Sequence, residues 1–258
     1  MIDASQKKAA YIQVEGLCKS FGVQTIFHNF NLTLPQSQVT AILGSNGCGK
    51  STLINLLSGL TPCDRGQITL AGKPLHRSQI GYVFQNYQAS LFPWLSAWDN
   101  ILYPLKIQQI PRQEQRSRIE HLIATCDIQL DWHRYPYQFS GGQQQLIAIL
   151  RAAIAAPDIL FLDEPFSSLD LEMTLEMRDK LQQICTNFAL TTAIVSHDLD
   201  DAIYLADRAI LLGKKPTQIL ATIPIPLPRP RTLNLLAQAN FIQIKQHCLQ
   251  CFQQSLSA

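Results

Sequence analysis

The hydrophobic and polar positions of the chain follow two periods in turn, which predicts strands alternating with helices. Short apolar runs rich in β-branched residues are typical of strands, and apolar residues three and four apart are typical of helices. The predicted strands are residues 11–15, 24–34, 39–43, 67–70, 80–85, 159–163, 191–196 and 208–213. The predicted helices are residues 50–60, 113–126, 143–155, 171–187 and 199–206. This alternation indicates an α/β fold with a mostly parallel sheet.

The pattern changes between residues 86 and 137. Strand signals are absent there, Pro93, Pro104 and Pro111 break the run, and residues 113–126 have helical spacing. We interpret this region, about residues 86–140, as a helical subdomain inserted into a main domain of residues 1–222. Residues 223–258 are predicted to form a proline-rich extended connector (IPIPLPRPR) and then an amphipathic helical tail.

Composition limits the class of protein. The chain has 258 residues, of which 47% are hydrophobic, so it can bury a sizeable core. Its net charge of +2 gives no indication of nucleic-acid binding. No apolar run reaches about 18 residues, so no membrane-spanning helix is expected, and the polar N-terminus lacks a secretory signal. Seven scattered Cys suit free thiols in a reducing cytosol. His247, Cys248 and Cys251 lack a second Cys pair at zinc spacing, so we interpret them as part of the tail helix.

Residues 44–52 carry the strongest chemical signal. They fit G-x-x-x-x-G-K-[ST], the phosphate-binding loop, and stand between a predicted strand and a predicted helix. Glycines let the loop turn tightly so that its N–H groups point at phosphate oxygens, and the helix adds its positive end. Lys50 is expected to reach the β- and γ-phosphates and Ser51 to hold Mg²⁺. The residues expected to bind ATP are Gly44, Ser45, Asn46, Gly47, Cys48, Gly49, Lys50, Ser51 and Thr52. Oxidation of Cys48 should block the nucleotide.

The apolar run at residues 159–162 ends in two carboxylates, Asp163 and Glu164, and such a run suits a strand buried on both faces. In open α/β sheets ligands bind beyond the carboxyl ends of the strands. Asp163 is therefore expected to support Mg²⁺, directly or through water, and Glu164 to polarise the water that attacks the γ-phosphate. Acidic residues after an apolar strand are common. The interpretation of Asp163 and Glu164 as functional depends on their position about 110 residues after the phosphate loop.

The stretch Phe139-Ser140-Gly141-Gly142-Gln143 resembles the signature of ATP-binding-cassette (ABC) ATPases, usually LSGGQ. The resemblance covers about residues 11–215. It implies a P-loop ABC cassette with a RecA-like, mostly parallel sheet core, an antiparallel β subdomain and an inserted helical subdomain. Four further positions resemble family motifs: Gln85 the Q-loop glutamine, Ser168-Leu169-Asp170 the D-loop, His197 the switch histidine, and Phe21 the aromatic that stacks on adenine, with Tyr11 as the alternative.

The resemblance also implies roles. Ser140, Gly141, Gly142 and Gln143 begin a helix and would close over ATP held by a second subunit, in a head-to-tail dimer with two ATP. His197 would contact the γ-phosphate, and Gln85 would touch Mg²⁺ and the attacking water. Each of these motifs also has an ordinary explanation, such as a helix cap, a solvated glutamine or a core aromatic.

Departures from the family pattern are few. Leu146 stands where Arg is usual, Leu150 where Ala is common, Ser196 replaces Thr, Asp201 replaces Glu, and Phe139 opens the signature. None removes a phosphate ligand, the metal site, the base or the switch. The chain is expected to be a competent ATPase whose signature helix is packed or regulated differently.

The resemblance favours one kind of ABC protein. About 90 residues separate Lys50 from Ser140, without the long heptads of chromosome-maintenance relatives, and one separate cassette is typical of an importer subunit. The expected partners are a second cassette, integral membrane permeases bound near residues 90–101, and indirectly a solute-binding protein, at the cytoplasmic face of a bacterial inner membrane.

Three short motifs resemble the nitrate/sulfonate/taurine branch, which also includes bicarbonate carriers: the Leu-Phe-Pro-Trp run, Asp163-Glu-Pro-Phe166 and Pro228-Arg-Pro-Arg231. A soluble ABC ATPase with an assembly role, or a non-hydrolysing regulator, is the alternative. Aromatic residues in 90–101 can also be subdomain core.

Overall fold

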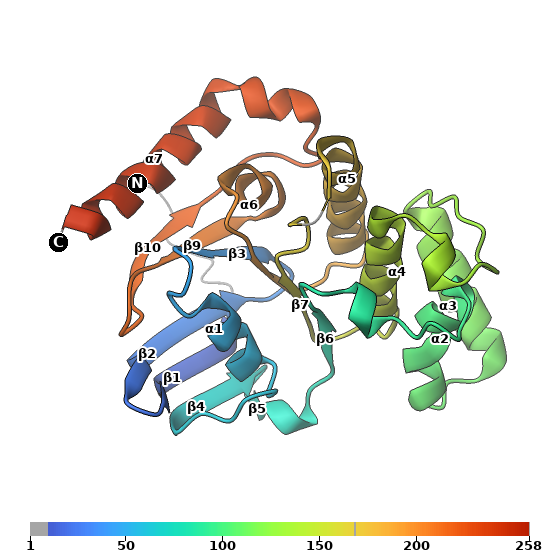
Figure 1. The fold of residues 1–258 in the computed structure, drawn as a ribbon, viewed down its shortest axis with the longest axis horizontal. Helices are drawn as coiled ribbons and strands as arrows, with labels where there is room; N and C mark the ends of the chain where they lie inside the picture. The colour runs from blue at the N-terminus through green and yellow to red at the C-terminus, as the bar shows by residue number, and fades with distance from the viewer. Residues whose placement is uncertain (1–9, 168, 258) are drawn as a thin grey trace, which may run out of the picture.

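The computed structural model describes residues 10–167 and 169–257 and contains two sheets (Figure 1). The smaller is antiparallel, in the order β2-β1-β4-β5. Its strands are β1 (Ala10–Phe21), β2 (Gln24–Pro35), β4 (Arg65–Leu70) and β5 (Lys73–Pro74). The larger has the order β10-β9-β3-β8-β7-β6, with every pair parallel except β9 and β10. Its strands are β3 (Val39–Gly44), β6 (Ile80–Val83), β7 (Ile159–Asp163), β8 (Thr192–Val195), β9 (Arg208–Leu212) and β10 (Ile219–Pro224).

Helices cover both faces of the larger sheet. Helix α1 (Lys50–Leu57) lies between the two sheets, and its buried leucines share one core cluster with both. The other face packs against α4 (Gly141–Ile154), α5 (Leu171–Asn187), α6 (Leu199–Leu205) and α7 (Ala239–Ser257). Alternate residues of β7 serve the two clusters, Phe161 on the α1 side and Leu162 on the other. The strand is continuously apolar because both of its faces are covered.

The helical subdomain projects to one side (Figure 1) and contains α2 (Ala97–Ile107) and α3 (Arg112–Thr125), which pack near α4. Short 3₁₀ turns η1 (Leu75–Arg77), η2 (Gln88–Ser90), η3 (Pro136–Gln138) and η4 (Leu233–Ala237) complete the elements. Over residues 10–167 and 169–257, none of the helices combines the length and the apolar content needed to cross a bilayer.

The predicted fold class is confirmed, with its parallel core, antiparallel subdomain and helical insertion. Among the described helices and strands, three were missed, namely α2, the two-residue strand β5 and β10. Pro104 was expected to break the chain but lies inside α2, where Ile101 and Leu105 are fully buried, so packing outweighs the lost hydrogen bond. Strand β10 was also missed, and it runs across the division at residue 222, which stays a prediction.

Candidate nucleotide site

The phosphate loop joins the end of β3 to the start of α1. Gly47 and Gly49 have φ of 77° and 112°, a region that favours glycine. Lys50 is the first residue of α1 and only 6% exposed, and its Nζ donates to the carbonyls of Gly44 (2.8 Å) and Ser45 (3.2 Å). The ammonium thus lies within the curl of the loop, where phosphate oxygens are expected.

A neighbouring loop supports the phosphate loop from behind. Thr217 is buried between β9 and β10, and its hydroxyl donates to the carbonyl of Cys48 while its N–H donates to the carbonyl of Ile26 at 2.7 Å. A Cβ on Gly49 would lie 3.0 Å from Thr217 Oγ1 and 3.1 Å from Ile26 Cγ2, so a larger residue here would crowd both side chains. Sequence reasoning missed Thr217 because a hydroxyl that bonds to a backbone carbonyl leaves no pattern. Burial raises the pKa of the Cys48 thiol, which makes its oxidation a smaller hazard than expected.

Asp163 ends β7 beside the phosphate loop. Its Oδ1 is buried and has no hydrogen-bond partner among the described residues. Burial, and then the charge of Glu164, raise the pKa of Asp163, while Ser51 and Lys50 partly offset the rise. An orphaned carboxylate oxygen next to a serine hydroxyl matches the hard oxygen donors that Mg²⁺ takes together with phosphate oxygens. These residues therefore fit the expected metal.

Glu164 and His197 come together because β7 and β8 are adjacent strands. Glu164 Oε2 lies 2.9 Å from His197 Nδ1. The Glu164 side chain is 16% exposed and that of His197 is 58% exposed, so the pair opens to solvent from the end of the sheet. Glu164 has φ of 48°, which costs a non-glycine residue on the order of 1–3 kcal/mol, and its N–H donates to the carbonyl of Val195. Such strain is typical of functional positions.

The other residues expected at the nucleotide are open to solvent. Gln85 is exposed two residues after the end of β6. Phe21 is 53% exposed at the β1–β2 turn, with Lys19 Nζ 5.2 Å from its ring. Tyr11 instead directs its hydroxyl to Asp158 at 3.4 Å and packs against the core cluster. Between the two aromatic candidates, the exposed ring of Phe21 is the one free to stack.

The signature residues form the start of α4. Ser140 is the N-cap, with its Oγ accepting from the N–H of Gln143 (3.3 Å), and Gln143 Oε1 accepts in return from the N–H of Ser140 (3.1 Å). This capping box holds the first turn of α4, in which Ser140 is exposed and Gly142 is buried. A Cβ on Gly142 would lie 2.2 Å from Cγ and 2.3 Å from Sδ of Met173, so the Met173 side chain would have to move to admit a larger residue. Asp170 caps α5 through Met173 N–H at 2.9 Å, and Ser168 of the predicted D-loop lies outside the described residues.

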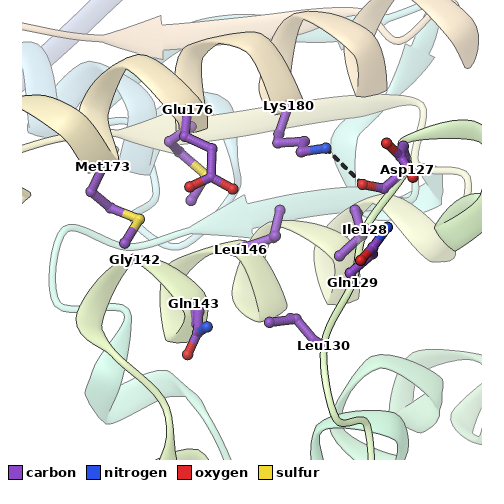
Figure 2. A pocket seen from close by; sticks show the side chains of 11 residues that line it. Asp127, Ile128, Gln129, Leu130, Gly142, Gln143, Leu146, Met173, Glu176 and Lys180 are labelled. Atoms are coloured by element: carbon purple, nitrogen blue, oxygen red, sulfur yellow. Dashed lines mark hydrogen bonds between the residues drawn. The ribbon is translucent and has the colours of Figure 1, made fainter.

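Leu146 borders a pocket of about 240 Å³ between α4, α5 and the chain after α3 (Figure 2). The Glu176 carboxylate points into this pocket from α5, while Lys180 Nζ donates to the carbonyls of Cys126 (2.9 Å) and Asp127 (2.7 Å). Leu146 is 6% exposed and contributes only apolar surface where Arg is usual. The structure thus places an apolar side chain opposite a carboxylate in this pocket, and the different packing or regulation of the signature helix stays a prediction.

Comparisons with known proteins agree with this geometry. The family profile described as "ABC transporter" matches residues 27–167. The Fe(3+) ions import ATP-binding protein FbpC of Escherichia coli K12 is 38% identical over 209 residues, which cover 79% of this chain and 60% of that protein. FbpC of Vibrio cholerae is 31% identical over 245 residues, covering 92% and 69%. The spermidine/putrescine import ATP-binding protein PotA of Pasteurella multocida is 37% identical over 220 residues, covering 83% and 58%.

Solved structures share the fold. The dimeric structure of MJ0796, a bacterial ABC transporter cassette, has a TM-score of 0.71 at 25% identity and covers 84% of this chain and 100% of that one. CbiO1 of Clostridium perfringens has a TM-score of 0.77 at 24% identity and covers 96% and 99%. The chain spans about 60% of the length of the E. coli and Pasteurella relatives. Its profile match and its identity to the Vibrio protein nevertheless show that this chain belongs to the ABC transporter family, as an ATP-binding protein.

Proposed function

We propose that the chain hydrolyses ATP as the energising subunit of an ABC importer. The observation that supports this most directly is the Glu164–His197 pair, 2.9 Å apart, at the same edge of the sheet as Asp163 and Lys50. A base, a γ-phosphate contact, a metal ligand and a phosphate-binding lysine are the parts that phosphoryl transfer to water needs.

Each residue then has a defined task. The N–H groups of the phosphate loop and Lys50 bind and orient the phosphates. Mg²⁺, when held by Ser51, Gln85 and Asp163, supplies charge neutralisation. Glu164 accepts the proton of the attacking water. An ionised carboxylate only accepts hydrogen bonds, so His197 Nδ1 donates its proton toward Glu164. In the neutral ring Nε2 then accepts from the attacking water, and it donates to a γ-phosphate oxygen when the ring carries both protons.

The catalytic unit we propose is a head-to-tail dimer. Ser140 is exposed at the N-terminal end of α4, and this end is open to an anion held by another chain. A dimeric cassette is among the structural relatives at 25% identity. In such a dimer Ser140, Gly141 and Gly142 would complete the nucleotide site of the partner subunit, with two ATP between the chains. The second subunit is this chain or a homologous one.

An exposed aromatic surface supports a membrane partner. Trp94 is 71% exposed, and Phe92 lies between it and Tyr103 at ring distances of 5.6 and 4.6 Å. Buried Asn100 fixes the loop beneath, with Nδ2 donating to Phe92 and Leu95 carbonyls at 3.0 Å each. Exposed aromatic residues on a fixed loop are typical of a binding surface. We propose that this surface docks a permease subunit at the cytoplasmic face of the membrane, which makes the soluble assembly role the weaker alternative.

The solute is a narrower proposal. Motif resemblance favours the nitrate/sulfonate/taurine branch, with bicarbonate as a further candidate, whereas the relatives above are named for import of iron and of polyamines. The relatives' names weigh against the anion branch, because they rest on 31–38% identity over most of the chain. Uptake assays with Fe³⁺, spermidine and taurine in cells lacking this chain would separate the three classes, since one uptake should fall and recover on complementation.

The activity is tested with Glu164→Gln, which keeps the size of the side chain and removes its basicity. We expect phosphate release to fall about 10²-fold or more, while ATP binding persists and ATP-dependent dimers accumulate in size-exclusion chromatography. Phosphate release equal to that of the unsubstituted chain would rule out Glu164 as the base. Gentle solubilisation of membranes tests the partner, because recovery of the chain without any polytopic protein would favour the soluble role.

A further inference from the structure

The C-terminal segment contacts both ends of α6, the short helix that begins two residues after His197. Helix α7 lies across β9, β10 and α6 (Figure 1), and the connector between β10 and α7 passes the end of α6. The segment therefore contacts the helix that directly follows the switch histidine. Neither the proposed reaction nor the proposed dimer uses these contacts.

Arg231 makes the first contact, at the C-terminal end of α6. It is 2% exposed, and its Nη1 donates to the carbonyls of Ile203 (2.9 Å), Tyr204 (3.0 Å) and Ala206 (2.8 Å). Its Nη2 donates to the carbonyl of Leu227 at 3.0 Å in the connector. A guanidinium here satisfies carbonyls that a helix end leaves unpaired and lies at the negative end of the helix dipole.

Arg231 is also fixed through its own backbone. Its N–H donates to Gln182 Oε1 at 2.7 Å, and Gln182 Nε2 donates back to its carbonyl at 2.9 Å. The hydroxyl of Tyr204 donates to the same carbonyl at 2.7 Å. Gln182 belongs to α5, so one residue links α5, α6 and the connector. Burial lowers the pKa of Arg231 to about 10, and the side chain stays charged at neutral pH.

Lys245 makes the second contact, at the N-terminal end of α6. Its Nζ lies 2.6 Å from Asp200 Oδ1, in the first turn of the helix. Asp200 is three residues from His197, and the N–H of Asp200 is held by Asp198 Oδ1 at 2.7 Å. The ion pair is partly exposed, so it holds the helix more weakly than the buried Arg231 does.

We propose that residues 225–245 form a clamp that positions His197 by holding α6 at both ends, with Arg231 as the principal positioning residue. The inference rests on the proposed ATPase function. With the clamp in place His197 lies 2.9 Å from Glu164. Loosening the clamp lets α6 shift, and a misplacement on the order of 1 Å can cost about 10²-fold in rate. Phosphate binding by the loop before α1 does not depend on the clamp.

The test measures steady-state ATP hydrolysis by the full chain. Arg231→Lys keeps the charge but loses the two-pronged donor, and Lys245→Ala breaks the exposed ion pair without burying anything. We expect kcat to fall about tenfold and about threefold respectively, with KM for ATP changed less than about twofold. Gln246→Ala, at an exposed position next to Lys245 on α7, is the matched control and should match the unsubstituted chain.

The deciding comparison repeats the variants in a His197→Ala background. If the clamp acts through His197, neither substitution lowers the residual rate further. The proposal would be overturned if the substitutions lower the rate of ATP hydrolysis by the same factor with His197 and with His197→Ala. It would also be overturned if neither single substitution lowers the rate. If Arg231→Lys folds poorly, the comparison is made with Lys245→Ala alone. Two other results would contradict the proposed function and not the clamp. One is an unsubstituted chain that does not hydrolyse ATP, and the other is unchanged ATP hydrolysis in Glu164→Gln.

Discussion

Replacing Asp163 with asparagine should stabilise the ligand-free chain while removing its response to Mg²⁺ and ATP. The ionised carboxylate is buried at the end of β7, and its Oδ1 has no partner among the described residues. Burial raises the pKa of this carboxyl, so folding keeps a charge at neutral pH in a place that disfavours it. An asparagine side chain has nearly the same shape as the aspartate and lacks that charge.

The size of the effect follows from these groups. An unsatisfied buried polar atom costs about 1–3 kcal/mol, and the new amide must itself find an acceptor, so we expect a net gain of about 1 kcal/mol. For a chain of this length that is a rise in Tm of about 2–4 °C. Ligand at about 100 times its Kd adds about 2.7 kcal/mol to the unsubstituted protein, or about 5–10 °C. Asp163→Asn should lose most of this second shift, and EDTA should abolish it in the unsubstituted chain.

The sign also depends on pH. The pKa of Asp163 is raised on folding, so its contribution to stability is most favourable when it is protonated and is lost as pH rises through the raised pKa. The advantage of Asp163→Asn should therefore be largest at neutral pH and shrink toward acid pH. Differential scanning fluorimetry over a pH series, with and without Mg²⁺ and ATP, measures both effects.

Asp99 provides a control of opposite sign. Its carboxylate accepts from Lys106 at 2.7 Å, and this interaction lowers the pKa of Asp99. Asp99→Asn should therefore lower the free energy of unfolding at neutral pH, and with it Tm, by about 1 kcal/mol or less because the pair is exposed. If both variants lose stability, or if Asp163→Asn keeps the full Mg²⁺-ATP shift, Asp163 is not a buried metal ligand and the reasoning fails.

Two further outcomes test the signature helix and the phosphate loop. Leu146→Arg should fold and change kcat, because its guanidinium can meet Glu176 across the pocket. Adding Glu176→Gln to that variant should lower the free energy of unfolding, measured by chemical denaturation, by about 1–2 kcal/mol. The same Glu176→Gln substitution in the chain that keeps Leu146 should lower it by about 0.5 kcal/mol or less. Unchanged kcat would show that this departure has no functional consequence. Cys48 should be alkylated slowly at neutral pH and faster at alkaline pH, because burial raises the pKa of its thiol, and bound ATP should slow the alkylation further. Mass spectrometry measures the alkylation rate, with half-buried Cys63 as the reference. Equal alkylation rates for Cys48 and Cys63 at neutral pH would contradict the prediction.

Much of the fold and the candidate site could be predicted because their signals are local. Residues within a few positions of each other determine the phosphate loop, the strand before Asp163 and the cap at Ser140. Because the motifs follow strands of a parallel sheet, their order along the chain predicts that they meet at the carboxyl edge of that sheet. Helix α2 could not be predicted, because Pro104 breaks the local pattern and only burial of Ile101 and Leu105 against α4 compensates. The roles assigned to the site residues stay predictions, although Lys50, Asp163 and the Glu164–His197 pair do lie at one edge of the sheet.

Arg231 belongs to the Pro228-Arg-Pro-Arg231 motif, but nothing in the sequence predicted the contacts that it makes. In a proline-rich connector an arginine is expected to be exposed, since carbonyl partners cannot be identified from residue types. Here its partners are main-chain carbonyls at the end of α6 and in the connector, and any residue types could supply them. The same holds for Thr217 behind the phosphate loop. Side chains that hold backbone groups can thus fix the position of residues such as His197 and Lys50, to which we assign roles at the nucleotide, although no residue pattern predicts these contacts. Substitution of the supporting residues distinguishes a positioned site from one that merely contains the right residues.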